Sequence, residues 1–208
     1  MKLLLLGATG GTGKHLLAQA LAAGHDVTVL ARDPGGISTQ HERLRVVEGD
    51  VLDGNTLAGV VAGQDAVISA LGRGKTFKSD HLIERCAPLI VSAMQANGVQ
   101  RLIFTSAIGA GETIRDAPLF IRLLIRVLLS DIYADKIAGE AHIRKSSLDW
   151  TLVQPSQLTD GALTERYRAG ERLAIRGLPT ISRADTAHFL LGQLHDPQYV
   201  RKVVLLTH

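Results

Sequence analysis

Three glycines near the amino terminus have the spacing that a diphosphate-binding turn requires. Gly7, Gly10 and Gly13 lie between a short apolar run, residues 3–6, and a stretch of helical periodicity. In such a turn the first glycine permits a tight bend, the second lets the backbone approach a diphosphate, and the third allows close packing of the helix. The diphosphate accepts hydrogen bonds from N–H groups at the positive end of the helix dipole. We therefore expect a dinucleotide site formed by Gly7, Thr9, Gly10, Gly11, Thr12 and Gly13.

The residue after the next apolar run indicates which dinucleotide binds. That run covers residues 27–30, and Arg32 follows it closely. An acidic residue here would bond the 2′-hydroxyl of an adenosine ribose, whereas an arginine accommodates a 2′-phosphate. The planar guanidinium of Arg32 matches a phosphate in shape and charge, so we expect NADP(H) to be preferred and NAD(H) to be accepted less well. Asp33 is a competing feature that either bonds an adenosine hydroxyl or starts the next turn.

Two further loops follow predicted strands, at the sheet edge where such folds bind ligands. Asp50 and Val51 come after the third apolar run, and Asp50 either bonds the adenine amino group or caps a turn. Leu71 and Gly72 come after the fourth, where a glycine lets the backbone pass beside a ribose. Arg73, the next residue, either contacts a phosphate or the substrate, or belongs to a solvated basic loop.

Apolar runs and amphipathic stretches alternate along the whole chain. Strands are predicted at residues 3–6, 27–30, 44–47, 66–70, 102–105, 150–153 and 203–206, with a short one near 173–175. Helices are predicted at residues 12–23, 53–61, 80–96, 118–130, 135–145 and 183–194. This pattern indicates a parallel sheet covered on both faces. Right-handed crossovers then favour one α/β, doubly wound Rossmann domain over residues 1–208, with strand order 3-2-1-4-5-6 and a further C-terminal strand.

The composition argues against several other classes of protein. The formal net charge is only +3 and aromatic residues make up 4%, so we expect no nucleic-acid partner. No segment reaches the roughly 20 apolar residues of a membrane span, so we expect no membrane partner. Cys86 is the only cysteine, which is typical of a reducing compartment and predicts a cytoplasmic protein. The histidines have no metal-ligand spacing, so no metal is predicted. The sequence is compatible with both a monomer and a homodimer.

Several stretches spread over the chain resemble the atypical short-chain dehydrogenase/reductases. Within them the resemblance is strongest to the biliverdin-IXβ (flavin) reductase group and to bacterial NmrA-like NAD(P)H-binding proteins. Besides the glycine turn, it is carried by residues 27–33, 49–52, 61–68, 105–107, 148–151 and 181–185. The resemblance implies a nicotinamide site near Thr105 and Ser106 and near the turn formed by Gln154, Pro155, Ser156 and Gln157.

The same resemblance implies roles for two residues in catalysis. Ser106 matches a serine that lies beside the nicotinamide and substrate, although a strand-end hydroxyl bonded to local backbone is the alternative. The flavin reductase group has a histidine where this chain has Gln157, so the contribution of that histidine is missing here. Lys136, followed by Glu140, matches the lysine that holds the nicotinamide ribose, the alternative being a surface lysine.

The proton-donating tyrosine of the larger superfamily is not in its usual place. The superfamily motif is Tyr-x-x-x-Lys, but the residue four before Lys136 is Ile132. Tyr133 lies one position later, about 100° further round a helix. Carbonyl reduction with a tyrosine as the acid is therefore disfavoured. Hydride transfer to a flavin or quinone draws its proton from solvent and needs mainly orientation and cofactor electrostatics.

The substrate side is expected around residues 110–132 and 155–182. Residues 119–129 are strongly apolar, with Arg122 and Arg126 on one helical face. They form either a lid with arginines for an acceptor phosphate or propionate, or a core or dimer helix. We expect an NADPH-dependent reductase of a small-molecule acceptor, namely a flavin, a quinone or a tetrapyrrole-like compound. The alternative is a non-catalytic NADP(H)-binding regulatory or redox-sensing protein, which the misplaced tyrosine and Gln157 favour.

Overall fold

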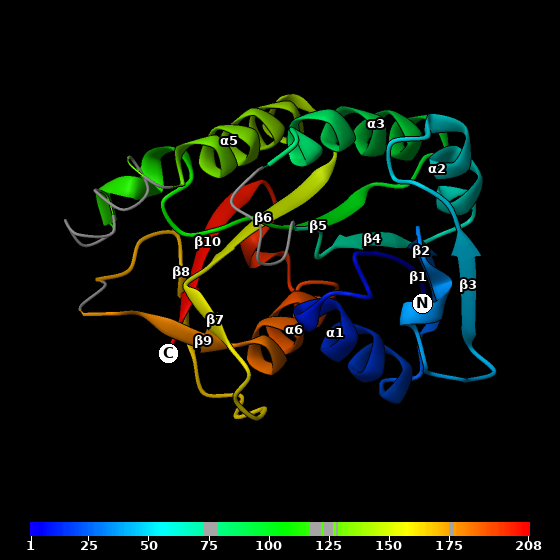
Figure 1. Cartoon of the computed structure of the whole chain (residues 1–208), viewed down its shortest axis with the longest axis horizontal. Helices are drawn as coiled ribbons and strands as arrows, with labels where there is room; N and C mark the ends of the chain where they lie inside the picture. The colour runs from blue at the N-terminus through cyan, green and yellow to red at the C-terminus, as the bar shows by residue number, and fades with distance from the viewer. Residues whose placement is uncertain (73–78, 117–121, 123–126, 128, 175–176) are drawn as a thin grey trace.

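The computed structural model describes residues 1–72, 79–116, 122, 127, 129–174 and 177–208. Within these residues eight strands form the main sheet: β1 (Lys2–Leu6), β2 (Asp26–Ala31), β3 (Leu44–Glu48), β4 (Ala66–Ser69), β5 (Arg101–Thr105), β6 (Asp149–Pro155), β8 (Arg168–Gly170) and β10 (Lys202–Thr207). Their order is β3-β2-β1-β4-β5-β6-β10-β8 (Figure 1). Adjacent strands from β3 to β10 are parallel, and β8 pairs with β10 in the antiparallel direction. The predicted order, with a C-terminal strand added, is confirmed.

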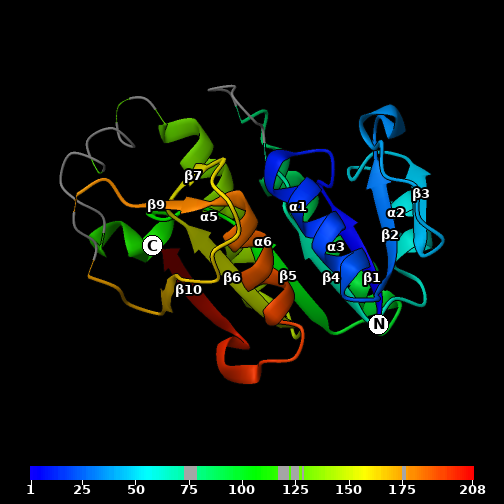
Figure 2. The ribbon, with the colours of Figure 1, turned by 90° about the horizontal axis from the view of Figure 1, so that it is seen from below.

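Helices cover both faces of this sheet. They are α1 (Gly11–Ala22), α2 (Gly54–Val61), α3 (Leu82–Ala96), α5 (Ser130–Lys145) and α6 (Arg183–Gly192). Helices α1 and α6 lie side by side on one face, whereas α2, α3 and α5 cover the other (Figures 1 and 2). Each face has its own apolar core, so the strands between them are buried on both sides.

Strand β1 shows why a continuous apolar run is needed at the centre of the sheet. Its side chains point alternately to opposite faces, as in any strand. Leu4 and Leu6 join the core under α2, α3 and α5, whereas Leu3 and Leu5 join the core under α1. All four leucines are at most 1% exposed. The run that precedes the glycine turn is therefore a central strand, and it fixes where the turn lies.

Two carboxylates of α5 hold the start of α3. Asp131 accepts a hydrogen bond from the backbone N–H of Ser79 at 2.7 Å. Asp135 is 3% exposed and accepts from the N–H groups of Ile83 and Glu84, at 3.2 and 2.8 Å. These bonds satisfy amide donors at the open amino end of α3. The predicted helix start at Asp135 is therefore wrong: α5 begins at Ser130, and Asp135 caps a different helix.

The C-terminal third contains strands that sequence periodicity did not predict. A second, two-stranded sheet pairs β7 (Gln157–Thr159) with β9 (Thr180–Ser182). A strand is predicted near residues 173–175, but Leu173 is not part of a strand. Its side chain packs over Gly170 instead. Gly170 is the last residue of β8, which pairs with β10. Most of the predicted helix 118–130 lies outside the described residues. In the described part of the chain, no helix has the length and apolar character to cross a membrane.

Candidate functional site

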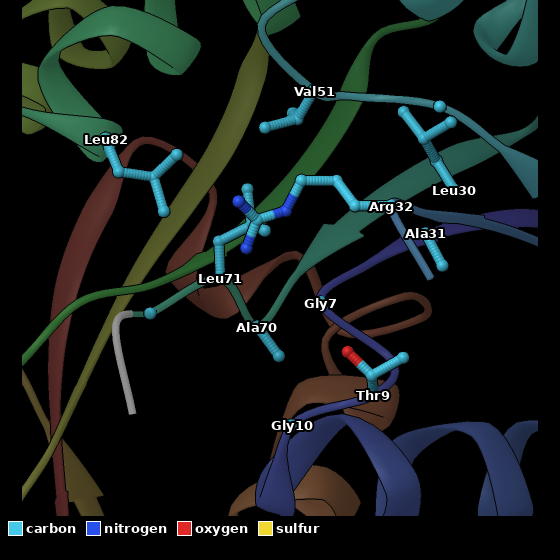
Figure 3. Close-up of a pocket in the computed structure, with 12 residues that line it drawn as sticks. Gly7, Thr9, Gly10, Leu30, Ala31, Arg32, Val51, Ala70, Leu71 and Leu82 are labelled. Carbon is cyan, nitrogen blue, oxygen red and sulfur yellow. The ribbon is translucent and has the colours of Figure 1, made fainter. Parts of the chain in front are cut away.

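Two adjoining cavities line the carboxyl ends of the central strands. One, of about 310 Å³, is bordered by the glycine turn, the end of β2 and the loop after β4 (Figure 3). The other, of about 570 Å³, extends from the same turn to the end of β5 and the side of α5. They share Gly10, Ala70, Leu71 and Gly72, and together they form one cleft. This is the edge at which doubly wound folds bind their ligands.

The glycine turn at the centre of the cleft leaves no room for side chains at two of its positions. Gly7 has φ of +86°, and a Cβ there would lie 2.7 Å from the carbonyl oxygen of Ala70. A Cβ on Gly13 would lie 2.0 Å from the carbonyl oxygen of Gly7. Helix α1 therefore packs directly on the turn. Gly10 is its N-cap and supplies no side chain to the first-turn N–H groups, which are left for an anion.

The first cavity suits the adenosine half of a dinucleotide. Arg32 is exposed, and its side chain extends from the end of β2 across the cavity toward Leu71 (Figure 3). Thr9, Val51 and Leu82 also border the cavity. Asp33 starts a turn, since its carboxylate accepts from the N–H of Gly35 at 2.9 Å.

Asp50 does not line either cavity. Its carboxylate accepts a hydrogen bond from the backbone N–H of Leu52 at 2.9 Å, and its carbonyl oxygen accepts from Asp53. In the geometry of this structure Asp50 stabilises the turn before α2, which is the alternative that the sequence left open. Its neighbour Val51 provides the side chain that faces the cavity (Figure 3).

The second cavity ends at two buried hydroxyl groups. Thr105 and Ser106 follow one another at the end of β5 and are 7% and 6% exposed. Both hydroxyl oxygens are buried without a hydrogen-bond partner among the described residues. A buried polar group without a partner costs free energy, which a polar ligand would recover. The hydroxyls and the amides of α1 thus fit the carboxamide and diphosphate of a nicotinamide dinucleotide.

Lys136 lies on the wall of the same cavity. Its ammonium group makes no hydrogen bond or close ion pair within the described residues, and Ile132 lies one turn before it. Burial lowers the pKa of Lys136, while the nearby carboxylates of Glu140 and Asp135 act to raise it. The hydroxyl of Tyr133 donates to the carbonyl oxygen of Ile108 at 2.9 Å, and burial raises the pKa of Tyr133 to about 12. Tyr133 is therefore engaged away from Lys136.

A buried polar network supports this wall from behind. Glu140, 2% exposed, accepts from the Gln154 side-chain amide at 2.8 Å and from Arg144 at 3.1 Å. Gln154 in turn accepts from the Thr113 hydroxyl at 2.5 Å. Sequence analysis identified Glu140 only as a companion of Lys136. No local signal joins it to Gln154, because 14 positions separate them.

The turn after β6 lies beside the cleft but does not line it. Pro155 is the last residue of β6, and the Ser156 hydroxyl donates to that of Thr207 at 3.1 Å. The N–H of Gln157 donates to the carbonyl oxygen of Pro179. Leu158, Asp160 and Arg183 line the second cavity instead, and sequence analysis assigned them no role. Arg73 and Arg126 lie outside the described residues, and Arg122 does not line either cavity.

The fold and the cleft define a Rossmann-type dinucleotide-binding protein. The chain belongs to the NAD(P)H-binding family, whose model matches residues 7–197. The sequence resemblance to NAD(P)H-binding proteins is thereby confirmed.

Relatives in sequence differ in how much of their length this chain covers. YwnB, an uncharacterized protein of Bacillus subtilis, is 26% identical over 209 residues, which are 96% of this chain and 94% of YwnB. The chloroplastic protein At2g34460 of Arabidopsis thaliana is 31% identical over 170 residues, which are 76% of this chain but 59% of that protein. Pinoresinol reductase 1 of the same plant is 31% identical over 49% of this chain and 34% of its own length.

Solved structures share the fold over nearly the whole chain. The oxidoreductase ylbE from Lactococcus lactis superposes with a TM-score of 0.83 and 22% identity, covering 99% of this chain and 90% of ylbE. ChuY, an anaerobillin reductase from Escherichia coli O157:H7, gives a TM-score of 0.82 and 21% identity, covering 99% and 96%.

Proposed function

We propose that this protein is an NADPH-dependent oxidoreductase that reduces a flavin, a quinone or a tetrapyrrole-like acceptor. The observation that carries the proposal is the single cleft, which leads from Arg32 across the glycine turn to Ser106 and Lys136. Reductases among the relatives and structural neighbours support the same class of reaction. The second cavity has apolar walls formed by Ala70, Leu71, Ala107, Ile132 and Leu158, which suit a flat, conjugated acceptor.

Two residues of the second cavity, Ser106 and Lys136, have distinct parts in this proposal. Bound NADPH supplies a hydride, that is, two electrons and one proton, and solvent supplies the second proton that the acceptor takes up. The Ser106 hydroxyl bonds the nicotinamide carboxamide or the acceptor, and so fixes their mutual orientation. Lys136 donates to the nicotinamide ribose hydroxyls from the side of α5. Tyr133 does not serve as an acid, because its hydroxyl is bonded to Ile108.

The first test is turnover. NADPH oxidation is followed by absorbance with flavin mononucleotide, a soluble quinone and biliverdin as acceptors. Ser106→Ala is expected to lower kcat/KM about tenfold, the value of one hydrogen bond between neutral groups, without lowering Tm. Tyr133→Phe is the matched control and keeps the wild-type kcat/KM. A loss of turnover in Tyr133→Phe with none in Ser106→Ala would refute the assignment of roles.

The cofactor preference depends on Arg32. Arg32→Leu removes the guanidinium proposed to bind the 2′-phosphate, so its Kd for NADP+ should rise about 10- to 100-fold, as expected for hydrogen bonds to a charged group. Its Kd for NAD+ should stay within about twofold of wild type, because NAD+ has no 2′-phosphate. Isothermal titration calorimetry measures both constants. Arg45→Leu removes the same charge from β3, where Arg45 lines a different cavity, and should change neither.

One observation favours a second function, dinucleotide binding without turnover. Ile132 stands where the superfamily has its tyrosine, and Tyr133 is bonded elsewhere. Among the residues that the structure describes, no tyrosine acid therefore lies in the cleft beside Lys136. A regulatory protein would bind NADP+ tightly and oxidise no NADPH with any of the three acceptors. Reduction of one acceptor at a rate that Ser106→Ala lowers would exclude this function.

A further inference from the structure

One charged side chain in the cleft has no part in the site described so far. Arg183 is the first residue of α6, and its side chain, 27% exposed, lines the second cavity. Helix α6 lies beside α1 (Figure 2). The Arg183 side chain therefore reaches the first turn of α1. It contacts Gly11 so closely that a Cβ on Gly11 would lie 2.6 Å from both Cδ and Nε of Arg183.

The same contact explains a glycine that the diphosphate-binding motif does not require. The motif uses Gly7, Gly10 and Gly13, and Gly11 is additional. Gly11 needs no positive φ, and Arg183 is the neighbour that a Cβ there would meet. The absence of a side chain at position 11 thus makes room for a guanidinium at the amino end of α1.

The guanidinium of Arg183 has N–H groups available for an anion in addition to the carboxylate of Asp160. Its Nη1 donates to Asp160 at 2.5 Å, while Nε and Nη2 make no hydrogen bond within the described residues. Asp160 is 88% exposed, so this ion pair contributes little stability and serves mainly to orient the guanidinium. A guanidinium has five N–H donors in a planar fork, which is suited to bidentate binding of phosphate oxygens.

The segment that carries Asp160 is itself anchored close to α6. Asp185, completely buried in α6, accepts from the N–H groups of Thr164 and Glu165, both at 2.8 Å, and from the Thr164 hydroxyl at 2.9 Å. These bonds hold the segment that follows Asp160 against the first turn of α6, next to Arg183. The unpaired, buried hydroxyls of Thr105 and Ser106 border the same cavity and independently indicate a polar ligand there.

We propose that Arg183 binds the diphosphate bridge of the dinucleotide, from the side opposite Arg32. Position 11 is then a glycine because a side chain there would displace Arg183. The proposal rests on the proposed function in one respect, since it takes a nicotinamide dinucleotide as the ligand. The amides of α1 and the guanidinium of Arg183 hold the diphosphate between two helices, and Arg183 serves NAD(H) and NADP(H) alike. This distinguishes it from Arg32, which acts on the 2′-phosphate.

Calorimetric titration of Arg183→Leu with NAD+ and NADP+ tests the assignment. The variant should bind both dinucleotides about 10- to 100-fold more weakly than wild type, by the same factor, so the preference for NADP+ is unchanged. Arg45→Leu, with the same loss of charge, should bind both as wild type does. Affinities for both dinucleotides within twofold of wild type, or a change confined to the KM of an acceptor, would overturn the proposal.

A double-mutant cycle tests the link to Gly11. Gly11→Ala should displace Arg183 and weaken NADP+ binding about tenfold in the wild-type background, yet change it less than about twofold in Arg183→Leu. Equal losses in the two backgrounds would mean that the alanine obstructs the dinucleotide directly, and would overturn the link. Because these are binding measurements, they separate the two proposals. If the protein binds NADP+ but reduces no acceptor, the proposed turnover is refuted, whereas the role of Arg183 in binding can still be measured. A wild-type chain that binds neither dinucleotide would overturn both.

Discussion

Gly13→Ala is expected to abolish measurable dinucleotide binding and to destabilise the fold. An added Cβ would lie 2.0 Å from the carbonyl oxygen of Gly7 and 2.7 Å from Cα of Ala8, both of them backbone atoms. Helix α1 must then move away from β1, at a cost of about 1–3 kcal/mol in the free energy of unfolding. The movement also displaces the first-turn amides, so we expect affinity for NADP+ to fall about 100-fold or more. Thermal unfolding and calorimetry measure the two effects.

Gly59→Ala is the matched control for this change. Gly59 lies inside α2, is exposed, and would meet nothing within 4 Å of an added Cβ. Alanine has the higher helix propensity, so this variant should gain about 0.5–1 kcal/mol of stability and bind NADP+ as wild type does. If Gly13→Ala kept both its Tm and its affinity, α1 would not pack on the turn as the structure has it.

Glu140→Met is expected to destabilise the fold and to lower the pKa of Lys136. Removing this buried carboxylate takes away the acceptor of Arg144 and one of the two acceptors of the Gln154 amide, the other being the Ala110 carbonyl oxygen. It also removes a charge that raises the pKa of Lys136. Arg144 is 38% exposed and stays solvated, so the loss comes mainly from the buried Gln154 amide and is about 1–3 kcal/mol. Denaturant unfolding gives the loss directly. The pKa of Lys136 should also fall, since burial then acts with less opposition, and chemical modification of Lys136 should occur at lower pH than in wild type.

An exposed glutamate provides the comparison. Glu84 pairs with His81 at 2.8 Å, and their side chains are 45% and 63% exposed. Glu84→Met should change the free energy of unfolding by no more than about 1 kcal/mol, because solvent screens such a pair. Similar losses in Glu84→Met and Glu140→Met would show that burial does not set the contribution of Glu140.

The parts of this structure that sequence analysis predicted depend on signals between near neighbours. The glycine turn, the apolar run at β1 and the arginine after β2 are local patterns, and the strand order follows from them by general rules of chain connection. Most of the residues proposed for the dinucleotide border the cleft, Thr9, Arg32 and Leu71 among them.

The features that sequence analysis missed depend on contacts between distant segments. Asp135 has the sequence context of a helix start, but it caps α3, about fifty residues away in the chain. Arg183 follows a capping serine and has no motif of its own, and its place becomes clear only when α6 is packed beside α1. Pro155, Ser156 and Gln157 were expected at the cofactor, yet pairing between β7 and β9 brings Leu158 to the cavity instead.

The carboxylates that join α5 to the start of α3 also connect the two halves of the cleft. Leu82, at the start of α3, borders the first cavity, which suits adenosine. Ile132 and Lys136, on α5, border the second cavity, which we propose for the nicotinamide. Asp131 and Asp135 tie these walls together through backbone amides on either side of Leu82. A displacement of one wall therefore strains the bonds that locate the other. Occupancy by adenosine and occupancy by nicotinamide are thus expected to be thermodynamically coupled, each half of the ligand favouring the other.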